Sequence, residues 1–237
     1  MLVELMVGLA MAALAISAAI ASLLVARDAT SAVHDMSRLQ QQAAHAMRVL
    51  ASQIRPAGSL DLQTGGAGTV LFQFATQAPA LEGGAVVHGT EGDSDTLRLA
   101  QSSPPLLPSQ RRDCLGQEIA PGERMEALFQ VDSKGNLRCK SSSGQVQPLV
   151  AGVAAFKLRY RVRQGDKVRS LRAGEVERAA LWSAVTALEV CLDLHGEERA
   201  AAYEGSYIGC AGQGAARDGR LHLVTRGLLR LRTSEGR

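Results

Sequence analysis

The feature that most constrains the fold is an apolar run at the start of the chain. Residues 2 to 26 hold one charged side chain, Glu4, and the run ends at Arg27. As a helix rising 1.5 Å per residue, such a run would extend further than a hydrocarbon core of about 30 Å. A cleaved secretory signal has a shorter apolar core, and here the helical pattern continues beyond it. We therefore expect a retained transmembrane helix.

Apolar side chains then recur at steps of three and four residues, which is the spacing of one helix face. They are Met36, Leu39, Ala43, Met47, Leu50 and Ile54. Pro56 and Gly58 end the pattern. One helix of about 54 residues, roughly 80 Å long, would meet lipid or neighbouring helices along residues 1–26 and pack one face on the head along 27–56. A homotypic coiled coil is the alternative, although the stripe spans only about three heptads.

Residues 57–237 are long enough for one β-rich head with its own core. The pattern predicts a short helix within 171–182 and loops at Gly65–Gly68 and Pro104–Pro108. The longest expected strands are Val153–Val162, Val185–Leu194 and Leu221–Leu231, with shorter ones at 69–74, 85–87, 96–99 and in a hairpin of Leu128–Val131 with Leu137–Lys140. The predicted fold class is α+β, with a long N-terminal helix packed on an antiparallel sheet.

Four cysteines, all beyond the apolar run, suggest an oxidising compartment. None forms a CxxC pair, and three pairings are possible from spacing alone. We favour Cys114–Cys139 and Cys191–Cys210, because each pair brackets a short stretch with strand and turn signals. Four buried free thiols are the alternative.

The composition argues against several functions. A net charge of +3 with 3% aromatic residues does not favour nucleic-acid binding. Arg159, Arg161 and Arg163 alternate along a strand, where a solvated face is a better explanation than an anion site. Asp93 and Asp95 lack the further oxygen ligands of an EF-hand loop, so we expect a turn there. No catalytic or nucleotide-binding motif is present, and we expect neither an enzyme nor a cofactor or metal.

Glu4 needs an explanation, because an unpaired carboxylate at bilayer depth costs at least a few kcal/mol. It either has a role or lies near enough to the interface to reach headgroup water. The segment LVELMVGLA around it resembles the N-terminus of type IV pilins, specifically the PilW family of minor pilins. In that family the mature chain begins Phe-Thr-Leu-Val-Glu after a basic leader ending in Gly. Since Met1 stands at the Thr, we expect a leader upstream, and a subunit that escapes processing is the alternative.

The head carries the same resemblance. Gly92 to Leu97 resembles the family's GSDTL segment, Asp113 to Gly116 its DCLG element and Leu149 to Val153 its LVEGV turn. Trp182 to Leu194 and Asp218 to Arg232 resemble its last two strands, although the final segment lacks the usual RNR ending. The resemblance therefore extends over nearly the whole chain.

The resemblance implies a minor pilin that waits in the inner membrane with its head in the periplasm and helps to initiate pilus assembly near the tip. Its partners would be other minor pilins, the major pilin and the inner-membrane assembly platform. Glu4 would pair with the N-terminal ammonium of a neighbouring subunit. Small residues on one helix face would allow close packing: Gly8, Ala12, Ala15 and Ala19. The alternatives are a J-type minor pseudopilin of type II secretion and a single-span membrane protein with a periplasmic ligand-binding head.

Overall fold

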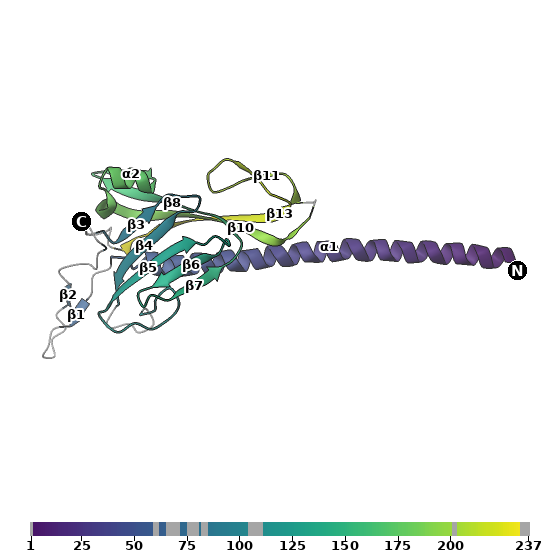
Figure 1. Ribbon diagram of the computed structural model, residues 1–237, viewed down its shortest axis with the longest axis horizontal. Helices are drawn as coiled ribbons and strands as arrows, with labels where there is room; N and C mark the ends of the chain where they lie inside the picture. Colours follow the sequence, from purple (N-terminus) through teal and green to yellow (C-terminus); the bar gives the residue numbers. More distant parts are fainter. Residues whose placement is uncertain are drawn as a thin grey trace.

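The computed structural model describes residues 2–58, 62–64, 72–74, 81, 85–103, 111–200 and 203–232. One helix, α1 (Leu2–Ile54), extends far out of a β-rich head that packs against only its C-terminal half (Figure 1). The predicted α+β fold, a long apolar N-terminal helix packed on antiparallel sheet, is confirmed.

Two antiparallel sheets make the body of the head. The first has five strands in sequence order, β3 (Val87–Thr90), β4 (Thr96–Ser102), β5 (Arg124–Val131), β6 (Leu137–Ser141) and β7 (Val146–Val150). The second has the order β13 (Arg220–Arg230), β10 (Val185–Arg199), β8 (Val153–Gln164), β9 (Lys167–Leu171). Smaller elements are the pairs β1 (Leu62–Thr64) with β2 (Phe72–Phe74) and β11 (Ser206–Ile208) with β12 (Gly214–Ala216), the helix α2 (Ala173–Arg178) and a 3-10 turn (Trp182–Ala184).

The second half of α1 contacts β13, β10 and β7, so it contributes to the core beside both sheets. Of the expected apolar stripe, four residues are buried and two, Met36 and Met47, are partly buried. The buried four are Leu39, Ala43, Leu50 and Ile54. Ala46, Asp35 and Gln53 are buried as well, although the stripe does not include them. The buried face of the helix is therefore wider than the stripe predicts.

Two turns lie at the contact between the two sheets. Between β7 and β8, Gly152 has a positive φ of 71°, and a Cβ there would lie 2.6 Å from the carbonyl oxygen of His195. Before β4, the Asp95 carboxylate accepts hydrogen bonds from the amide of Leu158 at 2.8 Å and the amide of Gly92 at 3.3 Å. The Lys157 ammonium lies 3.3 Å from the same carboxylate. Asp95 thus has the turn role expected for this segment and holds it against β8.

The three longest strands and the β5–β6 hairpin lie where the pattern predicts them, and β10 continues to Arg199. Five described strands were not expected: the three-residue strands β1, β11 and β12, and the longer β7 and β9. Pro148 in β7 removes an amide donor, and the first three residues of β9 are exposed, so neither shows a clean alternation of buried and exposed residues. The expected loops at Gly65–Gly68 and Pro104–Pro108 lie outside the described residues.

Candidate assembly surface

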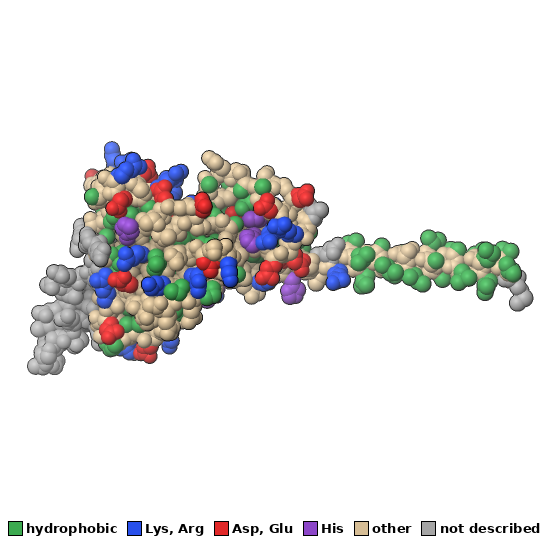
Figure 2. All heavy atoms as spheres, viewed as in Figure 1, with side chains coloured by type: hydrophobic (Ala, Val, Ile, Leu, Met, Phe, Trp, Pro, Cys, Tyr) green, Lys and Arg blue, Asp and Glu red, His purple; other side chains and the backbone are tan. Residues whose placement is uncertain are grey.

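The first half of α1 is an apolar surface that no other described part of the chain covers. Its large apolar side chains up to Val25 are between 54% and 77% exposed. Figure 2 shows them along the whole protruding segment. An apolar surface of this extent marks a site that lipid or another protein covers. The helix is long and apolar enough to cross a membrane, which is consistent with single-span anchoring.

The residues expected to make assembly contacts all lie on this exposed segment. Glu4 is in the first turn. The small residues follow steps of four, three and four, so they share one helix face: Gly8, Ala12, Ala15 and Ala19. All four are exposed, and a Cβ added to Gly8 would meet no atom within 4 Å. This face is open to the close approach of another helix.

A polar contact fastens α1 where it enters the head. The Arg38 guanidinium lies 3.0 Å from the Glu197 carboxylate at the end of β10, and its hydrogen bond lowers the pKa of Glu197. Arg38 also lies 3.5 Å from one oxygen of Asp35, whose other oxygen is buried without a hydrogen-bond partner. That second oxygen lies against Gly196 of β10. A larger residue than glycine could not occupy this position without moving the helix or Asp35.

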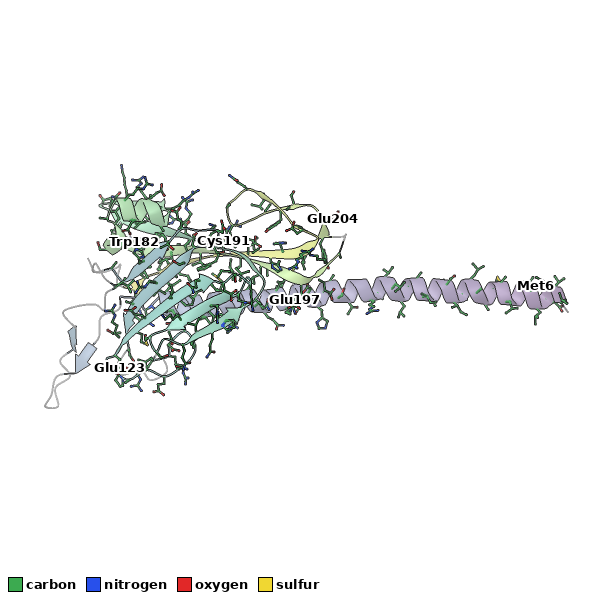
Figure 3. The ribbon with its side chains drawn as sticks, in the orientation of Figure 1. Met6, Glu123, Trp182, Cys191, Glu197 and Glu204 are labelled. Atoms are coloured by element: carbon green, nitrogen blue, oxygen red, sulfur yellow. A yellow bond between two sulfur atoms is a disulfide. The ribbon has the colours of Figure 1, made fainter. Side chains whose placement is uncertain are left out.

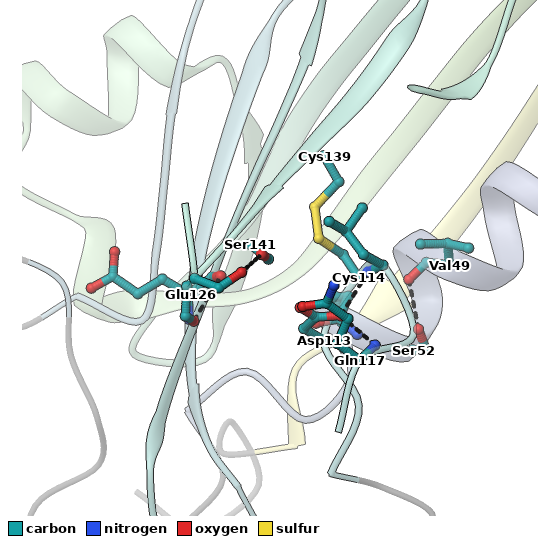
Figure 4. Close-up of a disulfide and its surroundings, with 12 residues drawn as sticks. Val49, Ser52, Asp113, Cys114, Gln117, Glu126, Cys139 and Ser141 are labelled. Atoms are coloured by element: carbon teal, nitrogen blue, oxygen red, sulfur yellow. Dashed lines mark hydrogen bonds between the residues drawn. A yellow bond between two sulfur atoms is a disulfide. The ribbon is translucent and has the colours of Figure 1, made fainter. Parts of the chain in front are cut away.

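At its other end, α1 is fixed by side-chain amides and a disulfide. Gln53 donates to the carbonyl of Arg112 at 3.3 Å and accepts a hydrogen bond from Gln101 at 3.1 Å. The loop that contains Arg112 continues to Cys114, which is bonded to Cys139 on β6. Figure 4 shows this disulfide beside the last turns of α1. The helix end is thereby held to the five-stranded sheet through covalent and hydrogen bonds.

The second disulfide joins Cys191 on β10 to Cys210 in a segment that we call the flap, residues 203–219 with β11 and β12. Both disulfides are the pairs expected from the sequence. Under the flap, the Asp193 carboxylate accepts a hydrogen bond from the Tyr207 hydroxyl at 2.6 Å and lies 3.0 Å from His222 of β13. Burial and the neighbouring carboxylate raise the pKa of Tyr207. The flap is thus fixed to the outer face of the four-stranded sheet.

The alternating arginines of β8 are held by neighbouring strands. Arg161 pairs with Glu189 of β10, and Arg159 donates to the hydroxyl of Ser170 on β9 at 3.1 Å. The same hydroxyl donates to Glu189 at 3.1 Å. Arg159 and Arg161 therefore lie on a solvent-facing side of the sheet, where side chains of neighbouring strands bind them. Among the described residues, no group of three or more His, Cys, Asp or Glu side chains is placed to bind a metal ion.

Comparison with known proteins adds information on the fold. No protein-family model matches the chain, and no curated protein matches its sequence. A solved type IV-like pilin from Thermus thermophilus is similar at 17% identity and a TM-score of 0.50, over 82% of this chain and 97% of that one. A chain in a binary complex of two pseudopilins from the type 2 secretion system of Vibrio vulnificus is similar at 13% identity and a TM-score of 0.39, over 82% and 98%.

The first of these similarities covers most of both chains. At 17% identity it establishes the architecture and leaves the biological role open. The chain has the fold of a type IV-like pilin, and the described residues include one apolar helix suited to anchoring in a membrane.

Proposed function

We propose that this chain is a minor pilin of the PilW type, which helps to initiate assembly of a type IV pilus and lies at or near the pilus tip. The observation that carries the proposal is the division of one continuous helix. Its first half is apolar and exposed on all sides, and its second half is packed in the head. Such a helix can reside in lipid before assembly and exchange lipid for neighbouring helices afterwards.

In this proposal residues 1–26 lie in the inner membrane, residues 27–56 form the amphipathic half of the helix, and residues 57–237 form a periplasmic head. Two disulfides in the head support an oxidising compartment. The partners are other minor pilins, the major pilin and the assembly platform of the inner membrane. The chain acts by assembly and has no catalytic role.

Glu4 sets the register of the subunit in this proposal. Its carboxylate pairs with the N-terminal ammonium of a neighbouring subunit, and the attraction offsets the desolvation that each charge would suffer alone. The small-residue face of Gly8, Ala12, Ala15 and Ala19 brings the two helices close enough for that pairing.

The test is the variant Glu4→Ala, expressed at native level in a strain that lacks the wild-type chain. We expect normal abundance in the membrane fraction, intact disulfides in the head, and loss of most of the chain from sheared pili. Glu123→Ala is the matched control, since Glu123 is an exposed acid on the head away from the protruding helix, and it should leave incorporation unchanged. Normal incorporation of Glu4→Ala would refute the registry role.

The same strain separates this proposal from its alternatives. Loss of surface pili on deletion of the chain supports the pilus assignment. Loss of protein secretion with normal pili indicates a type II secretion pseudopilin instead. A chain that stays in the membrane and never appears in sheared pili is a single-span protein with a different periplasmic task.

A further inference from the structure

A shallow groove opens where α1 enters the head. The helix segment from Ala32 to Gln40 forms one side, and Tyr203 and Leu221 form the other. The groove measures about 370 Å³, and most of its lining is apolar. Val33 on its helix side is 70% exposed, and Tyr203 and Leu221 are partly buried. This is an apolar surface at the end of the head that faces the N-terminus of α1 (Figure 3).

The height of the groove along the helix points to what covers it. Ala26 is the last residue of the apolar run, and Ala32 follows six residues later, which is about 9 Å at 1.5 Å per residue. The headgroup layer on each side of a hydrocarbon core is about 5–7 Å thick. A transmembrane helix is tilted by about 20° on average, which lowers one side of the head further. With Ala26 at the core boundary, Ala32 lies just beyond the headgroup layer, so a tilt toward this side brings only the membrane-proximal rim of the groove to the outer edge of the headgroups.

The charges around the groove are nearly balanced. The end of β10 and the turns next to Tyr203 carry four carboxylates and three guanidinium groups, and α1 adds the guanidinium of Arg38 and the buried carboxylate of Asp35. They are Glu197, Glu198, Glu204, Asp218 and Asp35 with Arg199, Arg217, Arg220 and Arg38. Balanced charge neither draws this end of the head to an anionic surface nor repels it. Attraction to lipid would therefore come from the apolar lining and from Tyr203, an aromatic residue type enriched at membrane interfaces.

We propose that the membrane-proximal rim of this groove is a docking surface for the phospholipid bilayer, so that the head rests on the membrane with Val33, Tyr203 and Leu221 against the outer edge of the headgroups. The occupant is continuous with the lipid around the first half of α1, which distinguishes it from a separate protein partner. The inference depends on the membrane anchoring in the proposed function and adds an orientation of the head to it. A chain seated in this way cannot rotate freely about its helix axis in the membrane before assembly.

The single tryptophan of the chain makes a direct test possible. Trp182 lies in the part of the head away from the exposed helix, as Figure 3 shows. We would reconstitute the full chain in phosphatidylcholine vesicles whose acyl chains carry bromine, which quenches nearby tryptophan. Three proteins are compared: the wild type, and Tyr203→Trp and Leu14→Trp, each in a Trp182→Phe background. Leu14→Trp reports insertion of the helix, and the wild type reports a position remote from lipid.

We expect strong quenching at position 14, and at position 203 a quenching at least about twofold greater than at Trp182, strongest with bromine near the headgroup. The quenching at 203 should not change with salt or with the fraction of anionic lipid, because the charges there are balanced. Quenching at 14 with none at 203 would overturn the docking surface and leave the anchoring intact. Absence of quenching at 14 would refute the anchoring itself.

Two further outcomes also count against the docking surface. Quenching at 203 that disappears as the protein-to-lipid ratio rises would assign the groove to a second copy of the chain. Quenching that requires anionic lipid and is lost in salt would assign it to electrostatic attraction. Far-ultraviolet circular dichroism and intact disulfides check that Tyr203→Trp leaves the head folded. Tyr203→Phe is a second variant, whose contact with lipid is measured by crosslinking. Because it keeps the aromatic ring, the head of this variant should still rest on the membrane.

Discussion

The contact between Gly196 and Asp35 allows a quantitative test of how α1 is seated on the head. A Cβ added to Gly196 would lie 2.0 Å from Oδ2 and 2.9 Å from Cγ of Asp35. Gly196→Ala must therefore displace the carboxylate or lift the helix from β10. Overpacking of this kind costs about 1–3 kcal/mol, and we expect the free energy of unfolding to fall within that range.

The structure supplies two matched controls. Gly214 in β12 has no atom within 4 Å of an added Cβ, so Gly214→Ala should change the free energy of unfolding by less than about 0.5 kcal/mol. Asp35→Ala removes the obstacle, so Gly196→Ala in that background should also cost less than about 0.5 kcal/mol. The difference between the two backgrounds is a coupling of about 0.5–3 kcal/mol, as is usual for residues in contact.

The assay is denaturant unfolding of the full chain in detergent micelles, followed by the fluorescence of Trp182, the only tryptophan. A change in midpoint at constant denaturant slope reports stability. An equal cost of Gly196→Ala in both backgrounds would refute the reasoning, because the clash would then not involve Asp35. A negligible cost in the wild-type background would show that the helix does not lie on β10 as described.

Three more predictions follow from other contacts. Replacing Cys114 and Cys139 with Ala should lower the free energy of unfolding by about 3.5 kcal/mol, from loss of a cross-link that spans 25 residues, as measured by the same unfolding assay. Hydrogen bonds from Asn136, first from its backbone amide, lower the pKa of Asp132 below its ordinary 3.8, so the β5–β6 turn should be fully stabilised above about pH 4 and lose protection as the pH falls through the lowered pKa. Amide exchange of the turn measures this, and Asp132→Asn should abolish the dependence. Tyr207→Phe removes a hydroxyl that donates to a buried carboxylate and should cost about 1–2 kcal/mol in the unfolding assay and speed amide exchange in the flap.

The elements that could be predicted from the sequence are those with a long periodic pattern. The helix follows from a run of 25 residues with one charge, which is long enough to cross a bilayer, and then from a stripe of helical period from Met36 to Ile54. The strands β8, β10 and β13 are the longest of the head, and in β8 buried positions alternate with more exposed ones. Periodicity is a local property, and it needs no knowledge of what lies opposite.

The contacts that fasten the head depend on residues far apart in the chain. Asp35 belongs to the polar side of the helix by composition and is buried only because Gly196 leaves room for it. Tyr207, Asp193 and His222 meet under the flap. The flap sequence is rich in glycine and has no alternation of apolar and polar residues that would predict its strands. A signal was available for Gly196, since a glycine inside a long strand pattern often marks the close approach of another segment. The roles of Glu4, Gly8, Ala12, Ala15 and Ala19 remain predictions, because they concern contacts with other subunits.

The continuity of α1 has a mechanical consequence. The helix contains no proline, and after Gly8 no glycine, up to its end at Ile54. Such a rod transmits rotation as well as translation, since each residue turns the backbone by about 100° and advances it by 1.5 Å. The azimuth of the head around the helix axis is therefore set by the number of residues between Glu4 and Asp35. A change of one residue in that interval would turn a different side of the head toward its neighbours while hardly altering its height.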